Sequence, residues 1–396
     1  MFRKSITSQT KILAAIFVST AIYVVVNFYR FYKNNSPYEF DPWLINYQGG
    51  FVRRGMPGEL FFQIYDIFLL NPAFLIFLFV SILYGIFYFS FFRQLDLIKF
   101  RNIHYLILLS PISIVFPILN SKVTGHKEIL LFFFMSLCCL IFEKISKEKA
   151  FIVILLSIIF LGFSYEVLIF YLPYLVIIYF ISFSEIKIKE FVYISIFFIT
   201  VFIALLIVNL LFKGDKTTVE LICQSIANFV RENCISSGNI AHIGNTIKDF
   251  TEQKTNAPGA LGLYSSYLYI YGFGLFYGIL PLIIFLHKAY IKLNNKLFKI
   301  NFMGMMFLIF LITFPVYVLG ADWGRYMYIS YICTLIILAH LIFKKKIIVE
   351  NNVLVSKINL LPKKTITTLI VVYSLSFTVP LCCQDSFKLG LLKFFL

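Results

Sequence analysis

The chain has 396 residues, of which 60% are hydrophobic, 19% aromatic and only 14% charged, and its mean hydropathy is +0.88. This composition excludes a water-soluble globular protein of this length, because such proteins carry about 25% charged residues. The net charge of +16 and the pI near 9.4 suggest nucleic-acid binding, but no soluble segment has a basic stripe with interleaved aromatics, so we exclude that class too.

Long, continuously apolar runs predict helices, because the strands of a membrane barrel would alternate apolar and polar residues. We therefore expect an all-α, polytopic membrane bundle forming a single transmembrane domain over residues 1–396. The expected spans are residues 11–30, 71–92, 104–120, 128–143, 150–164, 167–183, 190–212, 262–286, 301–319, 326–343 and 365–382. Only a brief polar turn separates spans five and six, so this pair could instead be one long helix or a re-entrant element.

The distribution of lysine and arginine predicts the orientation of these spans. With the amino terminus in the cytoplasm, 21 of the 35 basic residues fall on the cytoplasmic side, as the positive-inside rule requires. Eleven spans then place the carboxyl terminus on the extracytoplasmic side. We expect a multi-pass protein of the bacterial inner membrane whose unusual polar residues lie on its outer face.

The first outer loop, residues 31–70, contains the segment DPWLINYQGGFVRRGMPGEL and is our first candidate site. Glycines such as Gly50 and Gly55 permit positive φ angles and close approach of backbone amides, and Pro57 suits the first turn of a helix. Arg53 and Arg54 run against the positive-inside bias and could bind an anion, best a diphosphate. The alternative for both arginines is interfacial anchoring by snorkelling.

The second outer turn, SKVTGHKEILLF, places His126, Lys127 and Glu128 at the start of the fourth span. A histidine beside a carboxylate can act as a general base or bind phosphate, although an ordinary polar helix start explains the same residues equally well. Glu166 lies on the same side of the membrane. If it is buried, its natural partner is an arginine of the first loop.

Two further outer segments complete the set of candidates. The turn GADWGRYMYISY carries Asp322 and Arg325, which could form a local ion pair or serve a site. The outer loop 213–261 is expected to contain an amphipathic helix over residues 219–230 and to act as a lid or an acceptor-binding element. Cys223 and Cys234 lie in this loop, where an oxidising compartment would permit a disulfide.

Several common motifs are absent from the sequence. It has no P-loop, dinucleotide-binding glycine fingerprint, metal-spaced Cys/His cluster or GxSxG elbow. We therefore expect no cofactor and no metal site. ATP-driven transport and redox chemistry are disfavoured for the same reason.

Three short stretches, DPWLINYQGGFVRRGMPGEL, GHKEILLFFF and ADWGRYM, carry a resemblance to a known family. They resemble elements of the Wzy-type polymerases that assemble O-antigen and capsular repeat units. The resemblance implies transfer of a glycan from an undecaprenyl diphosphate carrier onto another lipid-linked repeat unit, at the outer face of the inner membrane. It also implies membrane lipid, a flippase and a chain-length regulator as partners, and no nucleic acid.

The resemblance also suggests roles for the candidate residues. The diphosphate and substrate would be bound by Arg53, Arg54, Arg325, Gly50, Gly55, Glu166 and Lys127. The acceptor hydroxyl would be deprotonated by Asp41, His126, Glu128 or Asp322, and the sequence does not decide between these four.

Two other functions compete with the polymerase. A GT-C-type glycosyltransferase would add one sugar from a polyprenyl phosphate donor and would carry an essential acid in its first outer loop, which Asp41 fits. A polysaccharide or lipid transporter would need polar residues through the bilayer midplane, whereas the spans here are nearly free of charge and show no transporter-type repeat.

Overall fold

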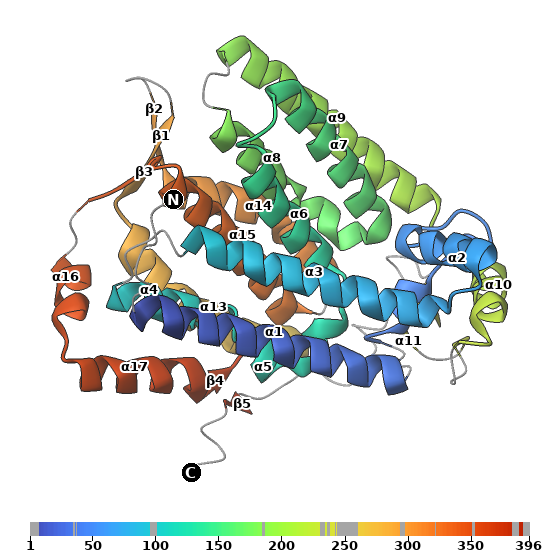
Figure 1. The fold of residues 1–396 in the computed structure, drawn as a ribbon, viewed down its shortest axis with the longest axis horizontal. Coiled ribbons are helices and arrows are strands. Elements are labelled where there is room, and N and C mark those ends of the chain that lie inside the picture. Colours follow the sequence, from blue (N-terminus) through green and yellow to red (C-terminus); the bar gives the residue numbers. More distant parts are fainter. Residues whose placement is uncertain are drawn as a thin grey trace. The chain divides into compact units, whose positions relative to one another are not determined.

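The fold is taken from a computed structural model of the chain (Figure 1). It describes residues 8–34, 36, 38–95, 101–183, 187–229, 234–235, 238–241, 243, 260–293, 298–320, 322–350, 353–381 and 388–390. The chain forms two compact units: unit 1 contains Met1–Val24, Phe87–Ser121 and Gly259–Leu396, and unit 2 contains Val25–Ile86 and Lys122–Pro258. Helices α1 (Ser8–Asn34) and α3 (Pro72–Leu95) each begin in one unit and end in the other.

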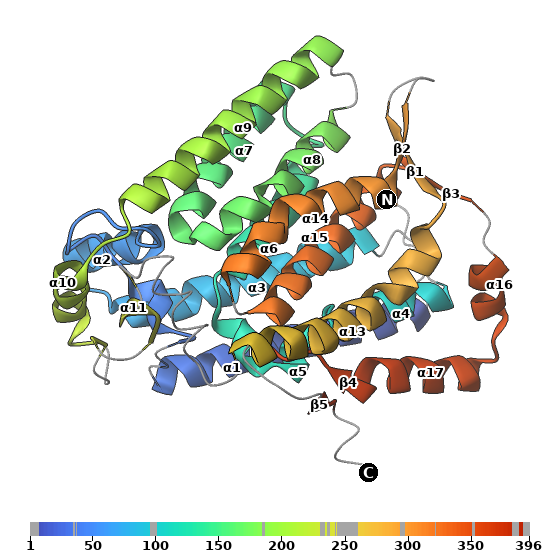
Figure 2. The same cartoon turned by 180° about the vertical axis from the view of Figure 1, so that it is seen from behind.

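The regular secondary structure in the described residues of unit 2 is all helical. Its elements are η1 (Asp41–Leu44), α2 (Met56–Phe68), α6 (Glu128–Ile141), α7 (Lys147–Ser164), η3 (Glu166–Tyr171), α8 (Leu172–Ser182), α9 (Ile188–Leu211), α10 (Lys216–Ile226) and α11 (Gly238–Ala241), and η2 (Ser121–Gly125) begins at its boundary. Helices α6, α7 and α8 pack against one another, and α9 lies beside α7 in both views of the ribbon (Figures 1 and 2).

Unit 1 combines helices with short strands. Its elements are α4 (Asn102–Leu108), α5 (Phe116–Leu119), α13 (Ala260–Leu286), β1 (Ala289–Leu293), β2 (Phe298–Asn301), α14 (Phe302–Leu319), α15 (Trp323–Phe343), β3 (Ile347–Val349), α16 (Val353–Leu360), α17 (Lys363–Ser376), β4 (Phe377–Thr378) and β5 (Lys388–Leu389). The strands form an antiparallel sheet in the order β2-β1-β3 and a small β4-β5 pair. Helix α15 is buried along most of its length and packs against α13 and α14.

Six helices of the described chain are long and apolar enough to cross a membrane. They are Lys11–Asn34, Pro72–Leu95, Ile188–Leu211, Leu268–Leu286, Phe302–Leu319 and Trp323–Phe343. Each matches one of the predicted spans, so the predominantly helical fold is confirmed and its long apolar helices are consistent with a multi-pass membrane protein. The total of eleven spans and the sidedness of the termini stay predictions.

The other five predicted spans correspond to shorter or more polar helices. Residues 104–120 divide into α4 and α5, and α6 and α17 have 14 residues each. A 14-residue helix is about 21 Å long, which is less than the ~30 Å of a bilayer core. Helix α7 has 18 residues, but its first turn carries three charged residues.

The chain breaks between α7 and α8, so the alternative of one long helix over these residues is wrong. Helix α7 ends at Ser164, Tyr165 is extended with φ −166°, and Glu166 opens the 3-10 turn η3 before α8 starts. A 3-10 turn has poorer hydrogen-bond geometry than an α-helix and is used in short pieces. Glu166 therefore lies in the connection between α7 and α8 rather than inside a continuous helix.

The outer loop predicted at 213–261 does contain a helix, although it starts earlier than expected. Asp215 caps α10 by accepting a hydrogen bond from the Thr218 amide at 2.8 Å, as is typical of a helix start. Cys223 and Cys234 form a disulfide with their Cα atoms 5.9 Å apart, which confirms that hypothesis. Residues 244–259 lie outside the described residues, and the lid role of the loop stays a prediction.

Close packing at Gly58 fixes where α2 starts and can be tested. A Cβ atom there would lie 2.0 Å from the carbonyl oxygen of Ile45, whereas a Cβ at Gly85, in the middle of α3, would meet nothing within 4 Å. We expect Gly58→Ala to lower the thermal unfolding temperature of the purified protein, because the backbone must move apart. Gly85→Ala is the matched control and should leave it unchanged or raise it, since alanine favours a helix by about 1 kcal/mol over glycine. Equal unfolding temperatures for the two variants would contradict the packing described.

Candidate functional site

The first outer loop is folded against the turn that precedes α6. The indole of Trp43, which is fully buried, donates a hydrogen bond from Nε1 to the carbonyl oxygen of Gly125 at 2.7 Å. Gly125 leaves no room for a side chain, since a Cβ atom would lie 2.5 Å from the carbonyl oxygen of Glu39. Asn27 of α1 donates to Thr124 Oγ1 at 2.8 Å. These contacts make one rigid layer of residues that are distant in sequence.

The double-arginine turn has an unusual backbone. Gly50 has φ +101° and donates its amide to Tyr47 O at 2.9 Å, so the positive φ that glycine permits is found here, whereas Gly55 has an ordinary φ of −78°. Arg54 also has a positive φ, +69°, which is uncommon for a residue with a side chain. Gly55 packs directly under the ring of Tyr47, where a Cβ would clash. Pro57 lies in the first turn of α2, as the sequence predicts.

Arg54 forms a two-pronged ion pair with Glu166. Its Nε donates to Oε2 at 2.6 Å, its second guanidinium nitrogen contacts Oε1, and its guanidinium carbon lies 5.1 Å from the ring centroid of Tyr165. Planar guanidinium and carboxylate groups match in this bidentate geometry, which is stronger than a single hydrogen bond. The predicted pairing of Glu166 with an arginine of the first loop is therefore confirmed.

Two more basic residues, Arg53 and Lys127, lie beside this pair. Arg53 has a guanidinium nitrogen 3.8 Å from Glu166 Oε1, a longer contact than that of Arg54. Lys127 Nζ donates to the carbonyl oxygens of Arg54 and Ser164, at 2.9 and 3.1 Å. We call Arg53, Arg54, Lys127 and Glu166 the cationic cluster. It joins the first loop, the start of α6 and the α7–η3 break, all within unit 2.

Burial and charge set the protonation of the cluster. Although burial acts to raise it, the pKa of the Glu166 carboxyl is lowered to about 2 by the charge and hydrogen bonds of Arg54 and by the charge of Arg53. Burial, and then the charge of Arg54, lower the pKa of the Lys127 ammonium well below its usual range. Burial also lowers the pKa of Arg53. The single carboxylate thus faces three basic groups.

The cluster is enclosed but not sealed from solvent. The side chains of Arg53, Arg54 and Glu166 are 11%, 14% and 20% exposed, whereas Lys127 is buried. Partly desolvated guanidinium groups interact with an anion more strongly than fully hydrated ones, because the local dielectric constant is lower. This geometry suits binding of a phosphate-like anion at the edge of the cluster.

The predicted bases are distributed over both units. Asp41 is buried in η1, Glu128 is buried as the first residue of α6 beside Lys127, and His126 is half-buried just before them. Asp322 belongs to unit 1 and pairs with Arg325 at 2.7 Å, which is the local ion pair that the sequence left open. Asp41, His126 and Glu128 therefore share a unit with the cationic cluster.

Sequence reasoning missed Glu39 as a candidate. Its side chain is almost completely buried against Gly125 and lies 4.0 Å from Lys122 Nζ, which is largely exposed. Burial raises the pKa of the Glu39 carboxyl, and the charge of Lys122 partly offsets this rise. The available signal was its position two residues before Asp41, in the same loop.

The first loop also contacts the long outer loop. Asn46 Nδ2 donates to Ser225 Oγ of α10 at 2.9 Å, and Asn239 Nδ2 donates to Tyr38 O at 2.9 Å. The Arg53 amide donates to Phe212 O at 2.8 Å, just after α9 ends. Residues 31–70 and 213–261, which the sequence suggests as separate candidate sites, are therefore joined by hydrogen bonds.

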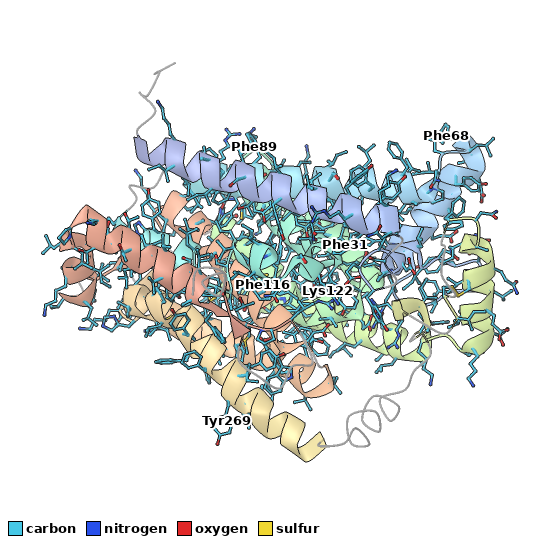
Figure 3. The ribbon with its side chains drawn as sticks, turned by 90° about the horizontal axis from the view of Figure 1, so that it is seen from below. Phe31, Phe68, Phe89, Phe116, Lys122 and Tyr269 are labelled. Carbon is cyan, nitrogen blue, oxygen red and sulfur yellow. A yellow bond between two sulfur atoms is a disulfide. The ribbon has the colours of Figure 1, made fainter. Side chains whose placement is uncertain are left out.

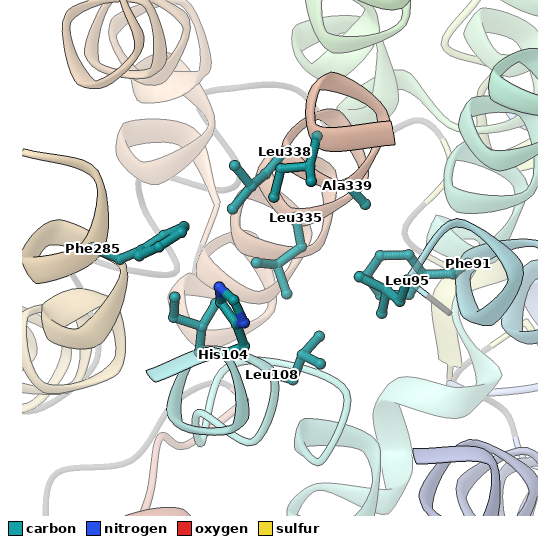
Figure 4. Close-up of a pocket in the computed structure, with 10 residues that line it drawn as sticks. Phe91, Leu95, His104, Leu108, Phe285, Leu335, Leu338 and Ala339 are labelled. Carbon is teal, nitrogen blue, oxygen red and sulfur yellow. The ribbon is translucent and has the colours of Figure 1, made fainter. Parts of the chain in front are cut away.

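A small cavity in unit 1 is lined almost entirely by apolar side chains (Figure 4). Its volume is about 30 Å³, which is room for a few water molecules and too little for a sugar. Among its lining residues His104 has the one polar side chain, and its imidazole ring packs edge-on against the ring of Phe285. Elsewhere in the described residues, no group of three His, Cys, Asp or Glu side chains is arranged to hold a metal ion.

The pairing of Glu166 predicts a pH-dependent stability. A carboxyl whose pKa is near 4.5 when unfolded and about 2 when folded stabilises the fold above pH 4.5, by at most about 3 kcal/mol, and this contribution disappears as the pH falls towards 2. We expect Glu166→Gln to lower the unfolding temperature in detergent markedly at pH 7, and the gap to wild type to narrow at pH 3.

Glu190→Gln is the matched control for this prediction. Glu190 also pairs with a basic residue, Lys147, but its side chain is 41% exposed, so water already screens the pair. Its loss should change the unfolding temperature little at either pH. A Glu166→Gln effect as small as that of the control, or one that grows on acidification, would show that the ion pair does not stabilise the fold.

Comparison with known proteins leaves the chain without an assigned family. No protein-family model, no curated protein and no solved structure matches it. Its function must therefore be inferred from its own residues.

Proposed function

We propose that this protein is a membrane glycosyltransferase that polymerises lipid-linked oligosaccharide repeat units, with an undecaprenyl diphosphate carrier as leaving group. The observation that carries the proposal is the cationic cluster, in which two arginines contact one carboxylate and Lys127 bonds the neighbouring backbone carbonyls, in a partly enclosed position. Such a cluster holds surplus positive charge where a diphosphate can approach. The apolar helices of the same unit suit a substrate with a long hydrocarbon tail.

The two arginines have different roles in this proposal. Arg54 is engaged with Glu166 through two nitrogens and adopts a strained backbone, so it shapes the turn. Arg53 contacts the same carboxylate at 3.8 Å, a distance at which an incoming phosphate oxygen can compete. Arg53 is therefore the residue that neutralises the leaving diphosphate. Lys127 fixes the carbonyl of Arg54 and so holds the turn in place.

The proposed reaction is a nucleophilic substitution at an anomeric carbon. The hydroxyl oxygen of the acceptor repeat unit bonds to the anomeric carbon of the donor glycan, and the bond from that carbon to the diphosphate oxygen breaks. The electron pair leaves with the carrier diphosphate, whose developing charge is stabilised by Arg53. The hydroxyl proton passes to a protein base, and no nucleotide is consumed.

Four carboxyl or imidazole groups in unit 2 could act as that base. They are Glu39, Asp41, His126 and Glu128. A general base works best when its pKa is near the working pH, and burial raises the pKa of Glu39 in that direction. The predicted roles of Asp322 as a base and of Arg325 as a substrate ligand stay predictions; both residues belong to unit 1 and pair with each other.

A second candidate function is a GT-C-type enzyme that transfers one sugar from a polyprenyl phosphate. The observation in its favour is the buried carboxyl of Asp41 in the first outer loop, only 1% exposed. The two functions leave different products in cells that lack the protein. Loss of a polymerase leaves one complete repeat unit on the acceptor lipid, whereas loss of a single-sugar transferase leaves a repeat lacking that sugar.

Complementation of a deletion strain tests the assignment of Arg53. We expect deletion to abolish the ladder of long polysaccharide chains, and Arg53→Ala to restore less than about a tenth of it, because one lost charge-stabilising donor typically costs a factor of 10² or more in rate. Arg53→Lys should recover part of the ladder, since it restores the charge without the planar fork. Gel profiles of extracted lipopolysaccharide or capsule provide the measurement.

Lys189→Ala is the matched control for this experiment, because it removes an exposed basic side chain of the same unit that lies in the first turn of α9, outside the cluster and away from the candidate bases. It should support a normal ladder. A normal ladder from Arg53→Ala, at normal abundance in the membrane, would exclude a diphosphate role for this residue. A truncated repeat in the deletion strain would instead identify the single-sugar transferase.

A further inference from the structure

Helix α2 has three chemically distinct faces. At 3.6 residues per turn, Phe61, Phe62 and Tyr65 share one side. The ring centroids of Phe62 and Tyr65 lie 6.0 and 5.3 Å from the ring centroid of Phe229. Gly58 on this side contacts the backbone of Ile45. This face is therefore the one that packs on the protein.

A second face of α2 is apolar but not covered by described residues. Leu60, Ile64, Ile67 and Phe68 follow the spacing i, i+4, i+7 and i+8, which places them along one stripe. Ile67 and Phe68 are 72% and 64% exposed, and Leu69 in the following turn is 78% exposed. Phe68 lies at the edge of the ribbon in Figure 3. Such a stripe would be unfavourable in water.

The third face of α2 is polar. Glu59, Gln63 and Asp66 lie between the apolar stripe and the protein-facing side, and Gln63 and Asp66 are exposed. A helix that crosses a bilayer would not carry a polar stripe towards lipid, and α2 has only 13 residues. Adjacent apolar and polar faces are typical of a helix that lies in the membrane interface.

The apolar stripe continues into a predicted membrane span. Leu69 ends α2 in a left-handed conformation with φ +56°, and α3 starts at Pro72, capped by Asn71, whose side chain accepts from the Ala73 amide. Along α3, Phe74, Leu78 and Ile82 form an exposed stripe at four-residue spacing. Because α3 is long and apolar enough to span a bilayer, residues next to its first turn lie at the depth of the membrane surface.

We propose that α2 is an interfacial helix whose Leu60–Ile64–Ile67–Phe68 face lies among lipid acyl chains while Gln63 and Asp66 face water. The occupant of the apolar stripe is thus the bilayer itself. Since Arg53 and Arg54 directly precede α2, the cationic cluster lies at the level of the lipid headgroups, where the phosphate of any lipid-linked substrate also lies. This inference concerns the position of α2 and does not depend on the proposed reaction.

Tryptophan scanning of the full-length protein in lipid vesicles tests the proposal. Ile67→Trp places a reporter on the apolar stripe, and Asp66→Trp places the matched control on the exposed polar face, about 100° away around the helix axis. The chain has two native tryptophans, and emission of the wild-type protein is subtracted for them. The quenchers are lipids brominated near the carbonyl end or near the methyl end of the acyl chain, and iodide in the water.

We expect lipid brominated near the carbonyl end to quench about half or more of the emission added by Ile67→Trp, because an interfacial face penetrates about 5–10 Å below the headgroups. Iodide should leave that emission nearly unchanged. Asp66→Trp should show the reverse pattern. Phe68→Trp, on the same stripe, should reproduce the result for Ile67→Trp.

Four results would overturn the proposal. Quenching of Ile67→Trp by iodide would show that the stripe faces water. Protection from both quenchers would show that a second copy of the chain covers it. Equal lipid quenching at both positions, or stronger quenching by the methyl-end lipid, would show that α2 is immersed in the bilayer. None of these measurements requires enzymatic activity, so their outcome is independent of the proposed function.

Discussion

The bidentate pair between Arg54 and Glu166 connects parts of unit 2 that are more than a hundred residues apart. It fastens the first outer loop to the break between α7 and α8, and Lys127 ties the same two segments through their backbone carbonyls. Removing one partner of such a partly desolvated pair leaves a charge without compensation, which is far more destabilising than losing a surface pair. The positive φ of Arg54 persists because these contacts determine its conformation.

The membrane character and much of the candidate site could be predicted from the sequence. Composition and long apolar runs indicate helices in lipid, and glycines beside paired arginines indicate a shaped turn. Glu166 was expected to need an arginine because a carboxylate in an apolar hairpin has few other partners. Each of these expectations follows from local residue chemistry, and the described structure contains the corresponding element.

Other features depend on contacts that no local pattern encodes. Nothing in the sequence around Asn46 shows that it binds Ser225, or that Lys127 bonds two backbone carbonyls rather than a carboxylate. The short helices α4 and α5 stand where the mean hydropathy of residues 104–120 predicted a single span, because hydropathy alone does not reveal where a chain turns inside protein. Glu39 was missed because its burial depends on Gly125, which follows it by more than eighty residues.

The hydrogen bonds of Lys127 have a consequence for how this protein can vary. Both acceptors, at Arg54 and Ser164, are main-chain oxygens, which every amino acid supplies. The bond therefore places no requirement on the side chain at position 164, whereas the donor must be a long amine at position 127. Position 127 is thus tied to one side-chain chemistry by this contact, whereas Ser164 is constrained by its burial and by its own hydrogen bond to the Phe160 carbonyl and not by Lys127.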